Sequence, residues 1–312
     1  MYNKTIDELI YLLALSHELV WNFTPRELEA IIMKFNSLNE FWNADEVKIK
    51  EFAKSNNIKV EKIERFLNKR YKIDINALLD LRKELLDKKI RVLLCTDKDY
   101  PPLLKKWKKP VRLSENRFIY KPRVLFLMGN KIDLSNCISI IGTRKCSNEG
   151  AELAKEIASK LVKHGYTVVS GMAIGIDSSA HIGAIDVRGR TTAVLPWLDP
   201  LYPPENKDLA KDILKNGCLL SEFYKKDLIR LPFKVNLFLE RDKIIAAISH
   251  KILVVETGVK GGSIRVANIA SKLGREIYVC KPKVHDKDKW NGFKRLRVYY
   301  KAKVYEDIDS LL

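Results

Sequence analysis

The chain has 312 residues, enough for one large or two medium domains with a substantial buried core. Its 57 Lys and Arg outnumber 39 Asp and Glu, and the formal charge of +18 favours a polyanionic partner, although general solubility also explains such an excess. No segment approaches the roughly 18 apolar residues of a membrane helix. The five cysteines have neither metal-ligand nor CxxC spacing. We therefore expect a soluble, cytoplasmic protein with reduced thiols and no membrane contact.

Residues 1–88 predict a small all-helical domain. An apolar stripe follows Leu9 to Leu19, and Thr24 with Pro25 is typical of a helix start that continues through Phe35. Helical periodicity returns in three later segments: Val47 to Ala53, Val60 to Leu67 and Ile75 to Leu86. The pattern indicates that Trp21, Phe41 and Trp42 are core residues and not ligand platforms. No motif in this domain carries chemistry.

From residue 89 to residue 312 the pattern changes to strands that alternate with helices. The predicted strands are Ile90 to Cys95, Val124 to Met128, Cys137 to Ile141, Tyr166 to Ser170, Thr191 to Leu195, Cys218 to Phe223, Lys251 to Thr257 and Glu276 to Cys280. Helices are expected after Ser147 and from about Asp177, Asn206, Arg241 and Ser263, with a closing strand at Val298 to Tyr305. This alternation predicts an α/β domain with an extended, Rossmann-like, doubly wound and mostly parallel sheet.

The turn after the strand at Cys137 to Ile141 is the first candidate site. Gly142, Thr143 and Arg144 lead to a helix that Ser147 or Asn148 would cap. A helix N-terminus offers free N–H groups to an anion, and Arg144 adds a planar fork for phosphate. The turn is neither GxGxxG nor a Walker loop, so an ordinary turn with a solvated arginine remains an alternative.

Three further turns end strands of the same predicted sheet. They are Ser170 with Gly171, Ser221 with Glu222, and Gly261 with Gly262 and Ser263. Because parallel strands end at one edge, these turns and the Gly142 turn should converge where such sheets bind ligands.

Two stretches concentrate the positive charge, residues 98–123 and 281–303, and each has a net charge of +7. The first is interpreted as one irregular connection, either a solvated loop or a polyanion contact. The second carries interleaved aromatic residues, some of which should pack on the sheet, whereas its charges are assigned no structural task. Seven lysines form the predicted basic rim: Lys105, Lys106, Lys108, Lys109, Lys287, Lys289 and Lys294. We expect the second stretch to track a nucleic-acid backbone.

The motifs of the sheet resemble a known family. Ile141-Gly142-Thr143-Arg144, then Val168 to Asp177 (VVSGMAIGID), and then Ala180-His181 resemble the pattern VGsR…VVSGlArGID…AH of DNA processing protein A, also called Smf. Shorter similarities extend in unbroken order from Asp99-Tyr100-Pro101 to Val254-Val255-Glu256. The sequence does not show the C-terminal winged-helix domain of some members, and we expect it to be absent.

The resemblance implies a function. It implies single-stranded DNA binding and protection, dimerisation through the Rossmann-like domain, and delivery of the DNA to a RecA-type recombinase in transformation or recombination. In the family the turn arginine grips phosphate, which maps to Arg144, and a phenylalanine that contacts a base maps to Phe238. The candidate DNA-binding residues are Gly142, Thr143, Arg144, Ser147, Ser170, Gly171, Lys234, Phe238, Arg241, Lys243, Gly261, Gly262 and Ser263.

Four positions depart from the family pattern. In the family's FPxRNRxIagLS segment the proline is Leu239, and the RNR is Arg241-Asp242-Lys243, so that an aspartate replaces the central asparagine and a lysine replaces the second arginine. A carboxylate at residue 242 would repel phosphate unless it pairs with Arg241 or Lys243. The glycine-rich SGSLxTA segment lacks its threonine here, at residues 261–267.

Catalytic patterns are weak in this sequence. Asp177 and His181 lie one helical turn apart without a nucleophile-elbow motif, so a packing or capping role is favoured for the histidine. Glu222 and Glu256 are candidates for a paired-carboxylate site or for acceptors of backbone N–H bonds. We expect a non-catalytic protein without metal or cofactor. The alternative is a nucleotide-processing or nucleotide-sensing Rossmann-like protein related to the phosphoribohydrolases, whose PGGxGT loop is not reproduced.

Overall fold

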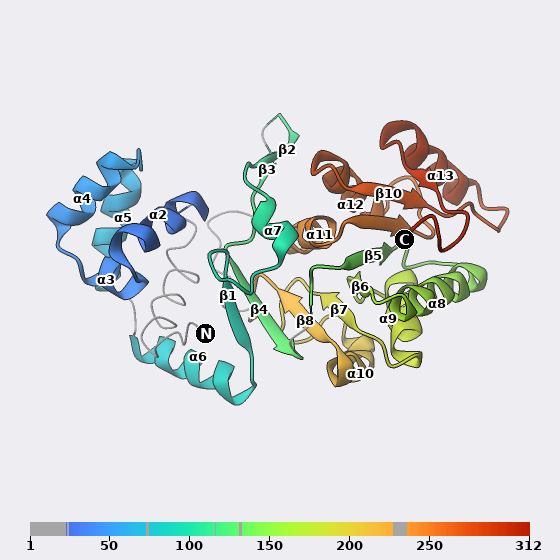
Figure 1. Ribbon diagram of the computed structural model, residues 1–312, viewed down its shortest axis with the longest axis horizontal. Helices are drawn as coiled ribbons and strands as arrows, with labels where there is room; N and C mark the ends of the chain where they lie inside the picture. Colours follow the sequence, from blue (N-terminus) through green and yellow to red (C-terminus); the bar gives the residue numbers. More distant parts are fainter. Residues whose placement is uncertain (1–22, 24, 73–74, 116, 131–132, 227–235) are drawn as a thin grey trace.

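The computed structural model describes residues 23, 25–72, 75–115, 117–130, 133–226 and 236–312. The N-terminal region is helical, as predicted, and α2 to α5 lie together on the left of Figure 1. Its helices are α2 (Pro25–Phe35), α3 (Leu38–Asn43), α4 (Glu46–Ser55), α5 (Val60–Arg70) and α6 (Ile75–Asp87). Ser37 and Asp45 cap α3 and α4, because their side chains accept backbone N–H bonds from Glu40 and Lys48. The predicted stripe at residues 9–19, Trp21 and Thr24 lie outside the described residues.

Aromatic rings fill the centre of this helical region. Phe41 stacks on Phe66 with ring centroids 4.8 Å apart, and Phe35 meets Phe41 edge-on at 5.2 Å. Trp42 is also buried, against Phe66. The predicted core role of Phe41 and Trp42 is therefore confirmed.

The described residues form one large sheet in the order β1-β4-β8-β7-β6-β5-β9-β10-β11. Its strands are β1 (Arg91–Leu94), β4 (Val124–Gly129), β5 (Cys137–Ile141), β6 (Thr167–Ser170), β7 (Thr191–Val194), β8 (Cys218–Ser221), β9 (Lys251–Val254), β10 (Glu276–Val279) and β11 (Lys303–Val304). All neighbouring pairs are parallel except those that β4 makes with β1 and β8. The predicted fold class is confirmed.

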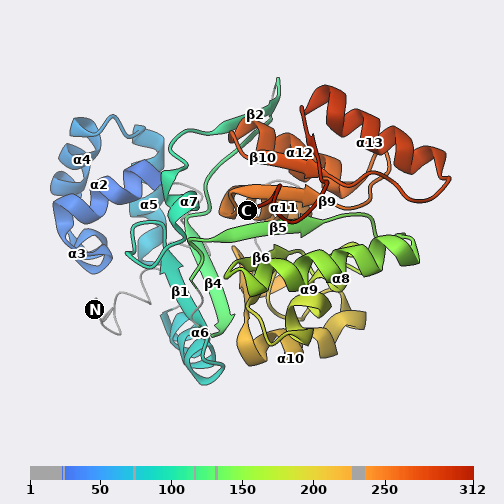
Figure 2. The same cartoon turned by 45° about the vertical axis from the view of Figure 1, so that its right-hand side comes forward.

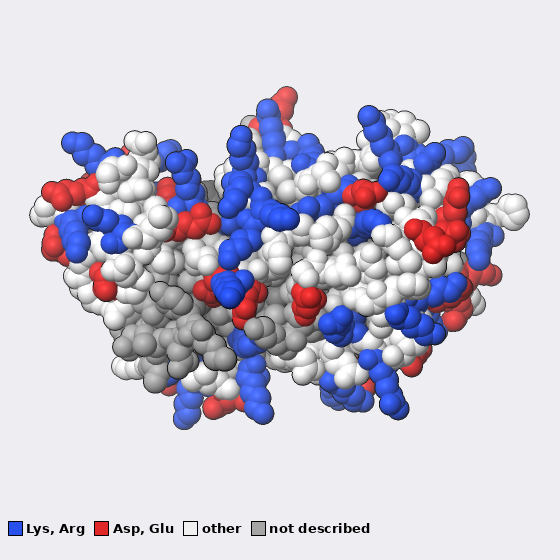
Figure 3. Space-filling model, viewed as in Figure 1, with Lys and Arg blue, Asp and Glu red and all other residues white. Residues whose placement is uncertain are grey.

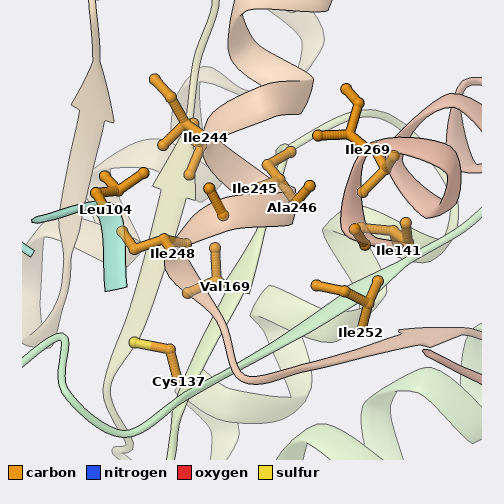
Figure 4. Close-up of a cluster of buried hydrophobic side chains, with 14 of the residues drawn as sticks. Leu104, Cys137, Ile141, Val169, Ile244, Ile245, Ala246, Ile248, Ile252 and Ile269 are labelled. Carbon is orange, nitrogen blue, oxygen red and sulfur yellow. The ribbon is translucent and has the colours of Figure 1, made fainter. Parts of the chain in front are cut away.

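Alternate residues of β5 serve the two faces of the sheet. Ile138 and Ile140 pack with α8 (Asn148–Lys163) and α9 (Ile176–Asp186) on one face. Cys137 and Ile141 pack on the other face with α11 (Leu237–Ile248) and α12 (Gly262–Lys272). Figure 4 shows α11 among these apolar side chains, and Figure 2 shows α8 to α10 on the opposite side of β5 from α12. Burial on both faces explains why these strands are apolar throughout.

The connections change face between β5 and β9. The helices after β5, β6 and β7, which are α8, α9 and α10 (Lys207–Asn216), cover one face. The helices after β8, β9 and β10, which are α11, α12 and α13 (Lys287–Tyr299), cover the other. Because β5 and β9 are neighbours, the topological switch point lies between their carboxyl ends. In open α/β sheets this is where ligands bind.

Three sequence predictions about local structure were wrong. Residues 98–123 are not one irregular connection, because they contain α7 (Pro102–Lys106) and a hairpin of β2 (Val111–Ser114) with β3 (Arg117–Ile119). The closing strand expected at residues 298–305 is only β11, since α13 continues to Tyr299. The Asp286 side chain caps α13 by accepting the N–H groups of Asp288 and Lys289, which fixes that helix. Helix α11 starts four residues early because Asn236 caps it.

The helical region is bonded to the sheet region. Glu84 of α6 accepts bonds from Tyr224 at 2.6 Å and Lys225 at 2.5 Å, and Lys88 pairs with Asp199 at 3.1 Å. One hydrophobic cluster continues from the helices to residues of β4, β7 and β8. The expected boundary between two domains at residue 88 stays a prediction. The helical region and the sheet region share this hydrophobic cluster.

Candidate nucleic-acid interface

The turn after β5 is held against the end of β9. Thr143 donates its N–H to the Glu256 carbonyl at 2.8 Å. A Cβ on Gly142 would lie 2.5 Å from Cγ1 of Ile176 and 2.8 Å from the same Glu256 oxygen, so only glycine fits. Arg144 then projects into solvent, and no residue in the described part of the chain bonds to its side chain. Within the described ranges, the switch point therefore presents the Arg144 guanidinium without a partner.

The N-terminus of α8 already holds an anion from the chain itself. Ser147 caps the helix by accepting the Gly150 N–H, and its own N–H and hydroxyl donate to the Glu256 carboxylate at 2.9 and 2.5 Å. Lys289 completes the site at 2.8 Å from Glu256. Burial alone would raise the pKa of Glu256, but bonds from Lys289 and Ser147 outweigh it and lower that pKa. The predicted helix N-terminus is present, but Glu256 occupies it, and the Ser147 hydroxyl is already bonded to that carboxylate.

The neighbouring helix α12 begins with an open turn. Gly261 is its N-cap residue and provides no side-chain cap, and a Cβ on Gly262 would meet only Arg265, at 3.9 Å. Ser263 is buried and donates its hydroxyl to Thr257 at 2.6 Å. At the switch point, α12 and not α8 therefore offers an accessible helix N-terminus to an external anion.

Asp242 is neutralised by two arginines. It lies 3.2 Å from Arg241 and 2.5 Å from Arg265, which also donates its Nε–H at 2.7 Å. Arg241 further approaches the buried Asp177, at 3.9 Å. Pairing with Arg241 was one of the two expected solutions, whereas Arg265 was missed. Its signal in the sequence was a cation in the first turn after Gly261 and Gly262.

Two candidate DNA contacts are buried and belong to the framework. Lys243 pairs with Glu222 at 2.7 Å and with Glu240. Burial alone lowers the pKa of Lys243, but these carboxylates outweigh it and raise that pKa above its usual value. The Ser170 hydroxyl donates to the Ile140 carbonyl at 2.6 Å. The expectation that these two side chains face DNA was therefore wrong.

Gly171 and Lys234 complete the predicted set. A side chain at Gly171 would collide with the guanidinium of Arg241, so this glycine makes room for an arginine. Lys234 lies outside the described residues.

Phe238 lies in the first turn of α11 and is only half-buried. Its ring meets Tyr202 and Trp197 edge-on, with centroids 5.4 and 6.2 Å apart. Lys226 lies over the Trp197 ring at 5.4 Å. Arg241, one helical turn after Phe238, lies against Gly171, which follows β6, and Trp197 follows β7. The rings of Phe238, Tyr202 and Trp197 therefore lie near the carboxyl ends of β6 and β7. Edge contacts leave a face of the Phe238 ring for another planar group.

The predicted basic rim is divided by the structure. Lys106, Lys108 and Lys109 are exposed, and Lys105 donates to the Asp97 carbonyl at 2.8 Å. Lys287 and Lys294 are exposed on α13, but Lys289 is buried against Glu256. The assumption that the second stretch has no structural task was thus wrong. Figure 3 shows Lys and Arg gathered over β2, β3 and α7 and again over α12 and α13.

The catalytic candidates do not assemble. His181 is buried with Nδ1 2.7 Å from the Thr191 hydroxyl, and burial lowers its pKa to about 3, which keeps it neutral. Glu222 and Glu256 follow β8 and β9, which are not neighbours, so they form no carboxylate pair. Over the described ranges, no cluster of His, Cys, Asp and Glu could hold a metal ion. Likewise, no described helix has the length and apolar character to cross a membrane.

The fold and the site define a doubly wound α/β protein with cations and an open helix N-terminus at its switch point. The sequence model of the family "DNA recombination-mediator protein A" matches residues 91–312, and the chain belongs to that family. Protein Smf of Synechocystis is 32% identical over 261 residues, which cover 81% of this chain and 60% of that relative. Protein Smf of Borreliella burgdorferi is 30% identical over 67% of this chain and 63% of its own length. The chain thus spans about three fifths of these relatives. The predicted family is confirmed.

Two solved structures resemble the fold. DNA processing protein A from Helicobacter pylori, whose structure describes a single-stranded DNA binding mode, is 26% identical with a TM-score of 0.57. The match covers 72% of this chain and 94% of that one. DNA processing protein A from Streptococcus pneumoniae has a TM-score of 0.65 at 24% identity, over 93% of this chain and 97% of that one. This second likeness shows the fold alone.

Proposed function

We propose that this protein binds single-stranded DNA along the carboxyl edge of its sheet. The observation that carries the proposal is the exposed Arg144 after β5, which has no partner among the described residues, together with the open N-terminus of α12 after the neighbouring strand β9. A strand that runs along this edge would meet a planar cation after β5 and backbone N–H groups after β9. The single-stranded DNA binding described for the Helicobacter pylori relative supports the same choice of ligand.

The ligand is a polymer and not a mononucleotide. One of the two helix N-termini at the switch point, that of α8 after β5, is closed to a mononucleotide phosphate. Here the Glu256 carboxylate, Ser147 and Lys289 fill that position. A Cβ on Gly150 would lie 2.5 Å from Cδ of Glu256, so the carboxylate is packed directly on the helix. The exposed cations, such as Arg144, lie outside this occupied position, where the backbone of a nucleic acid can run past them.

Among the residues that the structure describes, Phe238 is the aromatic candidate near this edge for the bases of the bound strand. Phe238 is anchored by edge contacts to Tyr202 and Trp197 and leaves part of its ring accessible. Stacking on such a ring tolerates any base, which suits binding without sequence preference. Arg241, one turn further along α11, lies between Phe238 and the Gly171 turn, where it pairs with Asp242 and approaches Asp177.

The wider role follows from family membership and belongs to the same proposal. The protein protects single strands in the cytoplasm, acts as a homodimer, performs no catalysis, and delivers DNA to a RecA-type recombinase in transformation or recombination. The name of the family to which the chain belongs, a recombination mediator, supports this role.

Fluorescence anisotropy with a labelled oligothymidylate tests the proposal. We expect tight binding that unlabelled single strands compete away, whereas nucleoside monophosphates and diphosphates do not compete. The same preparation should release neither base nor phosphate from those nucleotides. Competition by a mononucleotide, or its turnover, would establish the nucleotide-processing alternative in place of this proposal.

A further inference from the structure

The hairpin of β2 and β3 has a buried apolar face and a solvent-exposed face that carries aromatic side chains. Val111 and Ile119 pair across the two strands and are both buried in the core of the α11–α12 side. The opposite face carries Phe118, which is 48% exposed, and Tyr120, which is 42% exposed. Solvent faces of strands are normally polar, so two adjacent exposed rings at alternate positions indicate a contact surface.

Cations surround these two rings. Arg112 is the register partner of Phe118 across the hairpin, and its guanidinium donates to the Ser114 and Glu115 carbonyls, which fixes the charge on the hairpin. Further exposed cations of the same segment are Lys106, Lys108, Lys109 and Arg117. Glu115 is the one carboxylate between residues 105 and 120. In Figure 3 this part of the surface forms a column of blue over β2, β3 and α7.

The hairpin is rigidly attached at its base. Trp107 is buried and donates its indole N–H to the Lys109 carbonyl at 2.6 Å. Tyr100 is fully buried and donates its hydroxyl to the Pro122 carbonyl at 2.5 Å. Lys121, also buried, reaches Glu29 of α2 at 3.5 Å. The exposed rings are therefore held in place by the fold and would lose little freedom when a ligand binds.

The hairpin continues the surface proposed for DNA. Strand β2 contacts α12, the helix whose open N-terminus lies at the switch point. Arg265, in the first turn of α12, is partly exposed after pairing with Asp242. The cations of α12 and the hairpin thus lie on one side of the sheet, as Figure 1 shows for the two elements.

We propose that the hairpin of β2 and β3 is a second contact for the same single strand, on which bases stack against Phe118 and Tyr120. This proposal rests on the proposed single-stranded DNA binding. It assigns the contact that the DNA makes beyond the carboxyl edge of the sheet. Rings interleaved with cations fit a flexible strand, because each nucleotide offers one base face and one phosphate. A rigid duplex keeps its bases stacked inside and would use the cations alone.

The test is a double variant, Phe118→Ala with Tyr120→Ala, titrated with oligothymidylates of increasing length. Short oligomers that occupy only the carboxyl edge should bind the variant as tightly as the unchanged protein. Long oligomers should bind about 5- to 30-fold more weakly, the loss expected for one or two stacked bases. The conservative pair Phe118→Tyr with Tyr120→Phe keeps both rings and should bind long oligomers normally. Tyr71→Ala is the matched control, since it removes a 74% exposed ring from the helical region.

A second readout locates the contact directly. An oligomer that carries 5-iododeoxyuridine should crosslink on irradiation within the tryptic peptide of residues 118–123. Equal affinity of the double variant at every length, with no crosslink in this peptide, would overturn the inference while leaving the carboxyl-edge site intact. Loss of self-association in the double variant with unchanged DNA affinity would assign the rings to a second copy of the chain and also overturn it. If the unchanged protein binds no single strand, the proposed function itself fails.

Discussion

The two basic stretches, residues 98–123 and 281–303, have the same net charge of +7 but different structures. The first forms a helix and a hairpin, in which Lys105, Arg112 and Lys121 are bonded within the fold and Arg123 is buried, whereas Lys106, Lys108, Lys109 and Arg117 are exposed. In the second, four cations are bonded within the fold: Lys289 to Glu256, Arg295 to the Val259 carbonyl, Arg297 to the Ala302 carbonyl and Lys303 to Glu276. Net charge therefore identifies a stretch that can meet a polyanion, but only the pairing of each cation shows how much charge is free to do so.

Lys289→Met should give the largest effect, because it leaves the Glu256 carboxylate buried without its lysine. Removing one partner of a buried pair costs about 3 kcal/mol or more in the free energy of unfolding. Lys287→Met, two residues away on the same helix, removes an exposed cation and should stay within about 0.5 kcal/mol. Urea unfolding measures both variants. Equal midpoints for the two would show that Lys289 belongs with the free cations after all.

The aromatic residues extend the same comparison. Phe238→Ala should weaken single-strand binding by about 1–3 kcal/mol, and Phe238→Trp should retain it, since either ring can stack a base. Trp290 of the second stretch packs on Phe293 and donates its indole N–H to the Val284 carbonyl, so Trp290→Ala should lower stability and leave affinity unchanged. Anisotropy and thermal melts separate the two outcomes. If Phe238→Ala lowers the melting temperature but keeps full affinity, this residue is core.

Salt dependence compares the free charges of the two stretches directly. Changing Lys108, Lys109 and Arg117 to Ala should lower the slope of log affinity against log salt by about 2, since each single-strand phosphate contact contributes about 0.7. Changing Lys287 and Lys294 to Ala should lower it by about 1.4. Adding Lys289→Ala to that pair should reduce stability with no further change in slope. An unchanged slope in the variant that lacks Lys108, Lys109 and Arg117 would remove the first stretch from the DNA surface.

The smallest effect concerns Glu84, whose lysine partners hold the helical region to the sheet region. Burial alone would raise the pKa of Glu84, but hydrogen bonds from Lys225, Lys88 and Tyr224 outweigh it and lower that pKa to about 2. A depressed carboxyl pKa adds stability that is present above about pH 4.5 and is lost as the pH falls towards 2. Glu84→Gln should therefore cost about 1 kcal/mol at neutral pH, and the difference should vanish near pH 2. Glu46→Gln, from an exposed pair with Lys50, should show no such dependence.

The strands and their glycine turns could be predicted from the sequence because each depends on local chemistry. The apolar run Cys137–Ile141 and the cap at Ser147 appear in the structure where they were expected. The order of strands could not be predicted, because neighbours such as β5 and β9 are more than 100 residues apart in the chain. The occupation of the α8 N-terminus by Glu256 depends on that order, and so do the roles of Lys289 and Arg265.

The charged residues gave the weakest predictions for the same reason. Lys243 matches a DNA-contacting motif position, yet the structure buries it against Glu222, which follows β8. The sequence alone predicts that the Asp242 carboxylate repels phosphate unless it is paired. In the structure, Arg265 of α12 is a second partner that neutralises it. A side chain's formal charge is local information, but whether the charge is free depends on residues that only the fold brings near.

The central claim is that Arg144 at the switch point grips the phosphate of a single strand. The most direct measurement is an anisotropy titration of Arg144→Ala with a labelled oligothymidylate, beside Lys163→Ala, which removes an exposed cation from the other end of α8. We expect Arg144→Ala to lose about 1.5–3 kcal/mol of binding free energy, the scale of a charge-assisted hydrogen bond, and Lys163→Ala to bind normally. Equal affinity of Arg144→Ala and the unchanged protein would contradict the claim.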